Sequence, residues 1–290
     1  MYKIRKTTEL ADQLVLMEVE APRVAKNCQP GQFVIVRLDE QGERIPLTIC
    51  DYNRQEGTIT IVFQAVGVST KKMLALQPEE GFKDFVGPLG CPSTFIHEDL
   101  DTLKKKKLIF VAGGVGAAPI YPQVKWLHQQ GIQADVIVGS RNSELLILEE
   151  ELRAVSRNLY IATDDGSLGH HGRVTDVLEN LVKEEGRHYD ECIAIGPMIM
   201  MKFVSLLTKE LNIPTTVSMN PIMIDGTGMC GGCRLTVDGQ VKFACVDGPE
   251  FDGHQVDFDE AMKRMQIYKT QENLKIKHAH PGGCCGGETA

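Results

Sequence analysis

The sequence lacks two features that would point to a membrane or to nucleic acid. No apolar run approaches the roughly 18–20 residues that a membrane-spanning helix requires. Positive charge is not in excess either: 31 lysines and arginines against 39 acidic residues give a net charge of −8, whereas nucleic-acid-binding surfaces are normally basic. We therefore expect neither a membrane nor a nucleic acid as a partner.

The chain also lacks an export signal and any recognisable catalytic set of side chains. Its N-terminus enters amphipathic sequence at once, without the apolar core of a signal peptide, so we expect a cytoplasmic protein. No Ser/His/Asp arrangement and no catalytic pair of carboxylates stands out. Nine cysteines are many for a reducing compartment, where clustered thiols bind metal more often than they form disulfides.

Residues 1–100 have the pattern of a small antiparallel β-barrel or sandwich. Short runs rich in β-branched and aromatic residues predict strands at 15–19, 33–37, 47–50 and 58–63, separated by turn sequences. Residues 69–76 have helical spacing and are the one helix expected in this part.

Residues 101–218 alternate between apolar strands and amphipathic helices. This alternation is typical of a doubly wound parallel sheet covered by helices on both faces. We expect strands at 108–112, 134–139, 159–163, 191–195 and 215–218, and helices at 121–130, 144–155, 174–185 and 198–211.

From residue 219 to residue 290 the alternation stops. The segment 225–245 is dense in glycine and cysteine, a helix is expected from residue 258, and residues 281–287 are of low complexity. At about 100–200 residues per domain, the length agrees with this division into a barrel, an α/β domain and a small C-terminal domain with a tail.

A glycine-rich turn follows the first predicted strand of the α/β domain. Glycines at such a turn let the backbone approach a diphosphate, which then meets the free N–H groups of the following helix. Pro119 suits the first turn of that helix. We predict a nucleotide contact at Gly113, Gly114, Val115, Gly116, Ala117 and Pro119.

Further candidates follow other strands of the same domain. Gly196, Pro197 and Met198 end the fourth strand and should face the same crevice, because ligands of open α/β sheets bind at the carboxyl ends of strands. Taken alone, they fit equally well an ordinary helix start with core methionines behind it. Arg141 could contact a ribose or its phosphate, or be an ordinary surface arginine. Asp165 is a candidate nucleotide contact or part of a polar turn.

Two segments of the barrel are candidates for holding a flat heterocycle with a diphosphate. In the first, an arginine supplies a cation, a proline stiffens the backbone and a threonine can hydrogen-bond the ring. In the second, a strand is followed by the start of a helix, although Ser and Thr are also ordinary helix caps. The candidates are Arg44, Pro46, Leu47 and Thr48, and then Val62, Phe63, Gln64, Gly67, Ser69 and Thr70.

Three cysteines and an aspartate have the spacing of an iron–sulfur loop. Asp225, Cys230, Cys233 and Cys245 follow Asp-x4-Cys-x2-Cys-x11-Cys, close to the Cys-x4-Cys-x2-Cys run of plant-type [2Fe–2S] loops. A zinc site is the competing interpretation. Cys284 or Cys285 is the alternative fourth ligand, and buried reduced thiols are expected for Cys28, Cys50, Cys91 and Cys192.

In this order, the motifs resemble the ferredoxin–NADP reductase superfamily over nearly the whole chain. Residues 44–48 resemble its flavin motif, residues 113–119 its pyridine-nucleotide motif, and Gly196, Pro197 and Met201 its nicotinamide-side motif, although Ile195 stands where that family often has a cysteine. The resemblance implies bound FAD and NAD(H), with NADP(H) as the alternative nucleotide, and an oxidoreductase whose hydride transfer occurs between the cofactors.

The cysteine-rich segment narrows the resemblance to electron-transfer subunits. The segment is similar to the one in the electron-transfer subunit of dihydroorotate dehydrogenase. With Asp225 in the first ligand position, it resembles the small (alpha) subunit of NADH-dependent reduced ferredoxin:NADP oxidoreductase, also called the sulfide dehydrogenase beta subunit. This implies a [2Fe–2S] cluster, a larger glutamate-synthase-like flavin and [4Fe–4S] partner, ferredoxin as an indirect partner, and electron bifurcation. Three alternative functions remain. They are electron transfer for dihydroorotate oxidation, a diaphorase subunit of a hydrogenase or sulfur reductase, and a zinc-binding regulatory module with a nucleotide sensor.

Overall fold

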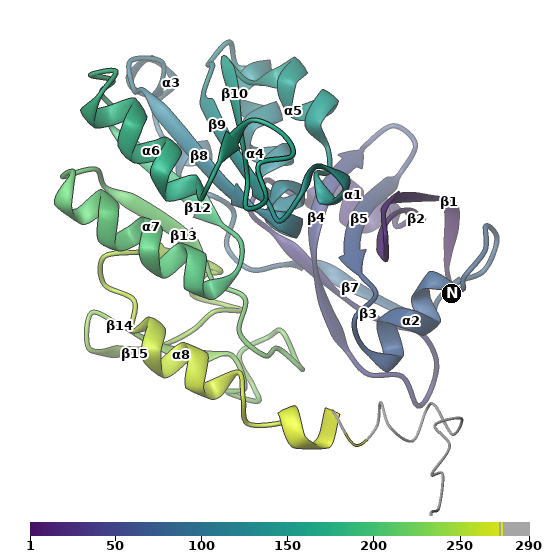
Figure 1. Ribbon diagram of the computed structural model, residues 1–290. Helices are drawn as coiled ribbons and strands as arrows, with labels where there is room; N and C mark the ends of the chain where they lie inside the picture. The colour runs from purple at the N-terminus through teal and green to yellow at the C-terminus, as the bar shows by residue number, and fades with distance from the viewer. Residues whose placement is uncertain (273, 275–290) are drawn as a thin grey trace, which may run out of the picture.

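The computed structural model describes residues 1–272 and 274, and its N-terminal part is a nearly closed antiparallel barrel (Figure 1, right). Seven strands pair in the order β6-β1-β2-β5-β4-β3-β7. They are β1 (Tyr2–Ala11), β2 (Leu14–Glu20), β3 (Phe33–Arg37), β4 (Ile45–Asn53), β5 (Thr58–Gln64), β6 (Gly81–Phe82) and β7 (Asp84–Leu89).

Aromatic contacts bring the two ends of this sheet together. The ring of Phe85 on β7 lies 5.6 Å from that of Tyr2 on β1 and 6.1 Å from that of Phe82 on β6, measured between centroids. Inward-facing Val, Ile and Met side chains of β2, β3 and β5 fill the interior, as alternation along half-buried strands requires. The start of β4 and the end of β5 lie at the border with the α/β part.

The barrel contains more helix than the sequence suggested. Helix α2 (Val68–Leu74) agrees with the predicted 69–76, but α1 (Pro22–Asn27) was not expected, so the prediction of a single helix is wrong. Pro22 stands at the first turn of α1, where a missing N–H costs nothing. The short elements η1 (Thr94–His97) and α3 (Leu100–Leu103) lead into the next unit.

The second unit is a mainly parallel sheet with strand order β11-β10-β9-β8-β12-β13-β16, which confirms the predicted fold class. The direction of strand order reverses between β8 and β12, and this reversal opens a crevice at their carboxyl ends. The parallel strands are β8 (Leu108–Gly113), β9 (Asp135–Ser140), β10 (Asn158–Thr163), β11 (His170–His171), β12 (Glu191–Ile195) and β13 (Thr215–Ser218).

Helices cover both faces of this sheet (Figure 1). The predicted helix 144–155 is interrupted: Leu148 has a left-handed φ of 56°, which separates η3 (Ser143–Leu145) from α5 (Glu149–Val155). Helix α4 (Ala117–Gln129) follows η2 (Gly114–Gly116) and packs with α5, whereas α6 (Val174–Lys183) and α7 (Met198–Glu210) pack together on the opposite face.

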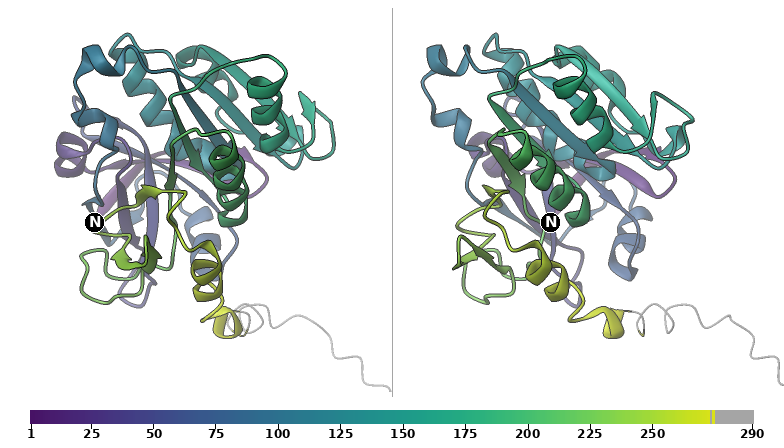
Figure 2. Two further views of the ribbon diagram at one scale, coloured as in Figure 1. Left: turned by 90° about the vertical axis from the view of Figure 1, so that its left-hand side faces the viewer. Right: turned by 60° about the vertical axis from the view of Figure 1, so that its left-hand side comes forward.

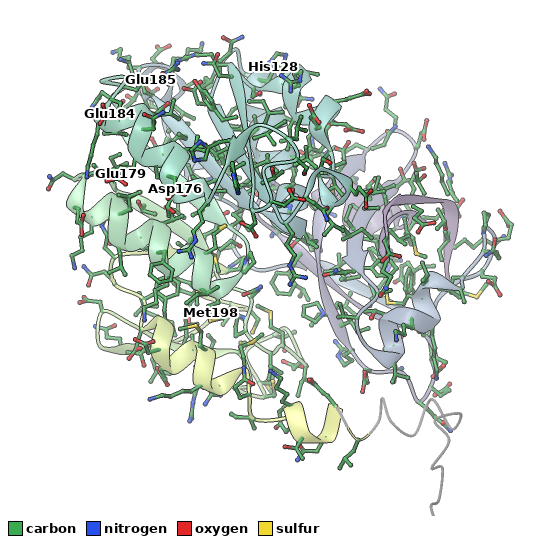
Figure 3. The ribbon with its side chains drawn as sticks, viewed as in Figure 1. His128, Asp176, Glu179, Glu184, Glu185 and Met198 are labelled. Carbon is green, nitrogen blue, oxygen red and sulfur yellow. The ribbon has the colours of Figure 1, made fainter. Side chains whose placement is uncertain are left out.

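The apolar residues of helix α6 are spaced at the period of a helix. Val174, Val177, Leu178 and Leu181 are buried on one face, as a 3.6-residue period requires. Of the acidic residues labelled in Figure 3, Asp176 on α6 and Glu184 and Glu185 just after it are exposed, and Glu179 on α6 is half-buried. In the described part of the chain, no helix is both long and apolar enough to cross a bilayer.

The C-terminal segment forms a hairpin, β14 (Arg234–Val237) with β15 (Gln240–Phe243), and then returns to the α/β sheet. Its strand β16 (Glu250–Asp252) pairs antiparallel with β13, and α8 (Phe258–Arg264) packs on α7. Both views of Figure 2 show this segment beside the sheet and below α7. The boundaries at residues 100 and 218 stay a prediction, because β16 joins the sheet of the middle unit.

Candidate functional site

A cleft of about 930 Å³ lies between the barrel and the carboxyl ends of the parallel strands. Both units contribute to its wall, so a ligand bound there would touch them together. Of the predicted cofactor residues, it is lined by Pro46, Leu47, Thr48 and Gln64 from the barrel and by Gly113, Gly114, Val115, Gly116, Pro119, Arg141, Gly196 and Pro197 from the α/β unit.

The turn between β8 and α4 offers its backbone to the cleft. Gly114 has a left-handed φ of +53°, and a Cβ atom built on it would meet no atom of residues 1–272 or 274 within 4 Å. A Cβ on Gly116 would lie 2.0 Å from the carbonyl oxygen of Ile195, so only glycine allows the turn to pack on β12. The N-terminal N–H groups of the 13-residue helix α4 follow directly, and this geometry suits a diphosphate.

The turn after β12 lies against the first turn. A Cβ on Gly196 would be 3.0 Å from the backbone N of Gly113, and a Cβ on Gly113 would be 3.0 Å from Cδ of Pro197. The two strand ends therefore form one continuous wall of backbone. Met198 does not line the cleft: its side chain is buried at the inner end of α7 (Figure 3).

The start of α6 also lines this cleft and was not predicted. Gly172, Arg173 and Thr175 line it together with Ser140 and Arg141 at the end of β9. The signal that could have found them is a glycine and an arginine directly before an amphipathic helix. Asp164 lines the cleft, whereas Asp165 accepts a bond from the backbone N of Ser167 at 2.9 Å and belongs to a polar turn.

On the barrel side, several predicted residues have other partners. Val62 and Phe63 are buried in the core, so their side chains do not line the cleft. The Thr70 hydroxyl accepts a hydrogen bond from the backbone N of Gly67 at 2.9 Å, and the Ser69 hydroxyl donates to Glu43 at 2.6 Å. These contacts are those of a helix start, and neither Gly67, Ser69, Thr70 nor Ala117 is among the cleft-lining residues of the described chain.

Arg44 contacts the cysteine-rich loop. Its Nε donates to the carbonyl oxygen of Ile224 at 2.6 Å, and one terminal nitrogen donates to that of Asp225 at 3.2 Å. The sequence suggested a cation for a diphosphate, and no recorded contact tests that role. What the structure shows is a link between the strand that carries Pro46–Thr48 and the loop of the predicted iron–sulfur ligands.

Two of the predicted ligand thiols lie side by side. The sulfurs of Cys233 and Cys245 are 3.3 Å apart and both residues are buried. Cys230 is exposed, and its sulfur accepts a bond from the backbone N of Gly232 at 3.4 Å, which is the main reason why the pKa of this thiol is lowered. Among the residues described, no three His, Cys, Asp or Glu side chains are grouped closely enough for a metal ion, so the four-ligand set stays a prediction.

Asp225 organises the backbone of the same loop. Its Oδ2 accepts bonds from Thr227, through the backbone N at 2.9 Å and the hydroxyl at 2.5 Å, and from the backbone N of Met229 at 3.2 Å. The Thr227 hydroxyl and these N–H groups lower the pKa of the Asp225 carboxyl. The loop is therefore shaped around an ionised carboxylate next to Cys230.

The other cysteines are mostly ordinary core residues. Burial raises the pKa of Cys28 and of Cys192 to about 12, and that of Cys50 in the same direction. Cys91 departs from the expectation of a buried thiol: it is exposed, and its thiol donates to the carbonyl oxygen of Val246 at 3.2 Å. Cys284 and Cys285 lie outside the described residues.

Comparison with known proteins agrees with this geometry. Residues 110–206 match the oxidoreductase NAD-binding domain, and residues 220–257 match the iron–sulfur cluster binding domain of dihydroorotate dehydrogenase B. A Thermotoga maritima homologue of the dihydroorotate dehydrogenase B (NAD(+)) electron transfer subunit is 43% identical, over 95% of this chain and 94% of its own. The chain belongs to the family of these electron transfer subunits and their homologues.

Two further relatives of this family are closely similar. A Clostridium beijerinckii protein of the adh 3′ region is 60% identical over 99% of this chain and its own full length. A chain in the structure of the NADH-dependent reduced ferredoxin-NADP oxidoreductase, described for flavin-based electron bifurcation, superposes with a TM-score of 0.88. It is 42% identical and the match covers 96% of this chain and 98% of that one.

Membership of this family makes the chain an NAD(P)H-dependent oxidoreductase subunit that transfers electrons, with an iron–sulfur domain and a ferredoxin–NADP reductase-like fold that supports FAD and NAD. Family members are named as subunits, so a larger partner is implied. The zinc-binding regulatory module considered for the cysteine-rich segment is not supported, because that segment matches an iron–sulfur domain.

Proposed function

We propose that this subunit passes electrons between NAD(H) in the cleft and a larger flavin and [4Fe–4S] subunit of the glutamate-synthase type, in flavin-based bifurcation among NADH, NADPH and ferredoxin. The observation that carries the proposal is the continuity between cleft and loop. Pro221 and Met223 line the cleft, and the next two residues are bonded to Arg44. A path of a few residues therefore joins the nucleotide site to the cysteines.

The chain's residues fit FAD and a nicotinamide nucleotide in this cleft. Half-buried Pro46, Leu47 and Thr48, together with exposed Gln64, offer a wall with hydroxyl and amide groups for a flat ring. The open backbone at Gly114 and the start of α4 suit a diphosphate, and the wall at Gly196 and Pro197 closes the far side. A flavin held by these residues would supply hydride exchange with the nicotinamide and single-electron exchange with the cluster.

In that arrangement the protein holds and orients the cofactors. The backbone turns at Gly113 and Gly196 bring the nucleotide close to the sheet, and Thr48 and Gln64 fix the flavin from the other side. Arg44 holds the cysteine-rich loop against the barrel strand next to the flavin wall. A displaced loop would lengthen the distance that an electron has to travel.

The donor set of the loop fits an iron–sulfur cluster, and we assign its ligands to Asp225, Cys230, Cys233 and Cys245 in a [2Fe–2S] centre. Glycines with left-handed φ at 226, 228 and 231 allow the loop to wrap, and an N–H group already points at the sulfur of Cys230. The three recorded bonds to Asp225 all use Oδ2, so we assign Oδ1 to the metal.

Cofactor analysis of the protein purified with its native partner tests the proposal directly. We expect flavin absorption, and iron and acid-labile sulfide in equal amounts, with co-purification of a larger flavin and [4Fe–4S] chain. A preparation without flavin and without iron would refute it. Steady-state assays with NADH, NADP(H) and ferredoxin, together and singly, then test bifurcation and the nucleotide preference.

An Asp225→Cys variant tests the ligand assignment. Replacing a hard carboxylate oxygen by a thiolate should change the EPR spectrum of the cluster and its reduction potential. An unchanged spectrum and potential would count against Asp225 as a ligand. The matched change Asp247→Cys alters an aspartate in the same segment that caps the backbone N of Phe243, and it should leave both properties as they are.

A second candidate function is electron transfer for dihydroorotate oxidation, and the match of residues 220–257 favours it. Reconstitution with a dihydroorotate dehydrogenase catalytic chain separates the two: dihydroorotate-dependent reduction of NAD(+) would select this function. A diaphorase of a hydrogenase or sulfur reductase would instead co-purify with hydrogenase or sulfur-reducing subunits.

A further inference from the structure

A carboxyl group that the proposed electron path does not use joins three parts of the molecule. Oε1 of Glu250, on β16, accepts hydrogen bonds from the Ser93 hydroxyl at 2.8 Å and from Nε2 of Gln123 at 2.9 Å. Ser93 belongs to the connection after the barrel and Gln123 to α4. One carboxyl oxygen therefore ties the C-terminal segment to both larger units.

This carboxyl lies directly behind the wall of the cleft. Gly31 and Pro249 line the cleft. A Cβ built on Gly31 would lie 2.4 Å from the Ser93 hydroxyl and 3.0 Å from Oε1 of Glu250. Gly31 therefore lines the cleft and also lies against the carboxyl and its Ser93 partner.

The surroundings of Glu250 favour its neutral form. Burial raises the pKa of this carboxyl to about 7, against the opposing effect of the bonds from Ser93 and Gln123. Glu191 on β12, two strands away in the same sheet, raises this pKa further and is itself paired with Lys106 at 3.3 Å. None of the three groups that act on the carboxyl is a cation.

The partner Gln123 can serve both protonation states. Its side chain is fully buried, and within the described part of the chain its Oε1 has no hydrogen-bond partner. An ionised Glu250 accepts from the amide NH2 group, as observed. A protonated Glu250 is a donor, and a rotated carboxamide would accept its proton through Oε1. The pair can therefore gain or lose a proton and still keep its hydrogen bond.

We propose that Glu250 takes up a proton from solvent when the cofactor in the cleft is reduced, and that it releases this proton when the cofactor is reoxidised. The inference rests on the proposed function, because it requires a redox cofactor in front of Gly31. The electrons come from the reduced nicotinamide, one O–H bond forms on Glu250, and no other bond changes there. The proton offsets the added negative charge across the wall of the cleft.

The test is a potentiometric titration of the purified complex between about pH 6 and pH 8.5. The flavin of this chain, as distinct from that of the partner, is followed by absorbance. Below the pKa of about 7, Glu250 already holds its proton and contributes nothing. Above it, reduction draws in an extra proton, so the potential should fall more steeply with pH. Glu250→Gln should retain flavin and lose this steepening. Identical pH profiles of the two proteins would overturn the inference.

Two further variants keep the test decisive if Glu250→Gln does not fold. Gln123→Leu removes a bond that lowers the pKa of Glu250, so the steepening should begin at higher pH. Glu191→Gln removes a charge that raises this pKa, so the onset should move to lower pH. Onsets that do not move in either variant would overturn the inference, whereas wild-type complex without flavin would instead refute the proposed function.

Discussion

Residues 113–116 and 226–232 are both rich in glycine and both lie at predicted cofactor sites, yet Gly116 in the first and Gly228 and Gly231 in the second are needed for different reasons. At Gly116, the requirement is space: a Cβ there would lie 2.0 Å from a backbone oxygen. At Gly228 and Gly231, the requirement is conformation, because both have left-handed φ values while a Cβ on either would stay at least 3.3 Å from its nearest neighbour. The first segment is held by a sheet and the second by side chains such as Asp225 and Arg44.

The largest effect is expected from removing a thiol of the second segment. Cys233→Ser should weaken iron binding by more than the roughly 10–100-fold typical of losing an outer-shell partner, because a proposed direct ligand is lost. Iron and sulfide content and the EPR signal measure this. Cys91→Ser is the control: this exposed thiol contacts the carbonyl oxygen of Val246 and is outside the proposed ligand set, so iron content should stay unchanged.

Adding one methyl group to the first segment should act on folding as well as on binding. Gly116→Ala forces Cβ onto the carbonyl of Ile195, and we expect a loss of about 3 kcal/mol in the free energy of unfolding, with NADH affinity reduced tenfold or more. Chemical denaturation and fluorescence titration check both. Gly67→Ala, whose Cβ would meet the Thr70 hydroxyl at 3.8 Å, should cost less than about 1 kcal/mol.

The third prediction concerns the strand that returns from the loop to the sheet. The pKa of Glu250 is raised from its ordinary value of 4.5 to about 7 in the folded protein. Between these two pH values the folded protein therefore keeps a proton on Glu250 that the unfolded chain has lost. Stability should therefore fall as pH rises from about 4.5 to 7, and Glu250→Gln should remove about 1–3 kcal/mol of this fall. Urea denaturation at pH 5 and pH 8 compares the two proteins, and equal slopes would contradict the expectation.

The smallest effect is expected at the link between loop and barrel. Arg44→Ala removes two bonds to carbonyl groups and should cost about 1–2 kcal/mol, with faster loss of the cluster to a chelator. Arg54→Ala, which removes a bond to the carbonyl of Cys28 on the far part of the barrel, should cost a similar amount and leave the chelation rate unchanged. Equal chelation rates in both variants would show that Arg44 does not hold the loop.

Most strands and helices could be predicted because their sequences repeat with the period of the element. Continuous apolar runs marked β8 and β12, and the spacing of Val174, Val177, Leu178 and Leu181 marked α6. Strand β1 was missed, because Lys, Arg, Thr and Glu alternate with few apolar residues along its exposed face. Helix 144–155 was predicted too long, because the left-handed Leu148 leaves no trace in residue type.

The sequence by itself determined the order of the parts, the two glycine turns and the spacing of the cysteines, since all of these depend on neighbours along the chain. Only the tertiary structure decided where Arg44 points, that Arg173 faces the cleft, and that Glu250 meets Ser93 and Gln123. Ser93 and Glu250 are 157 residues apart. Contacts of that kind depend on how three units pack together, and the periodicity of residues within one element does not predict that packing.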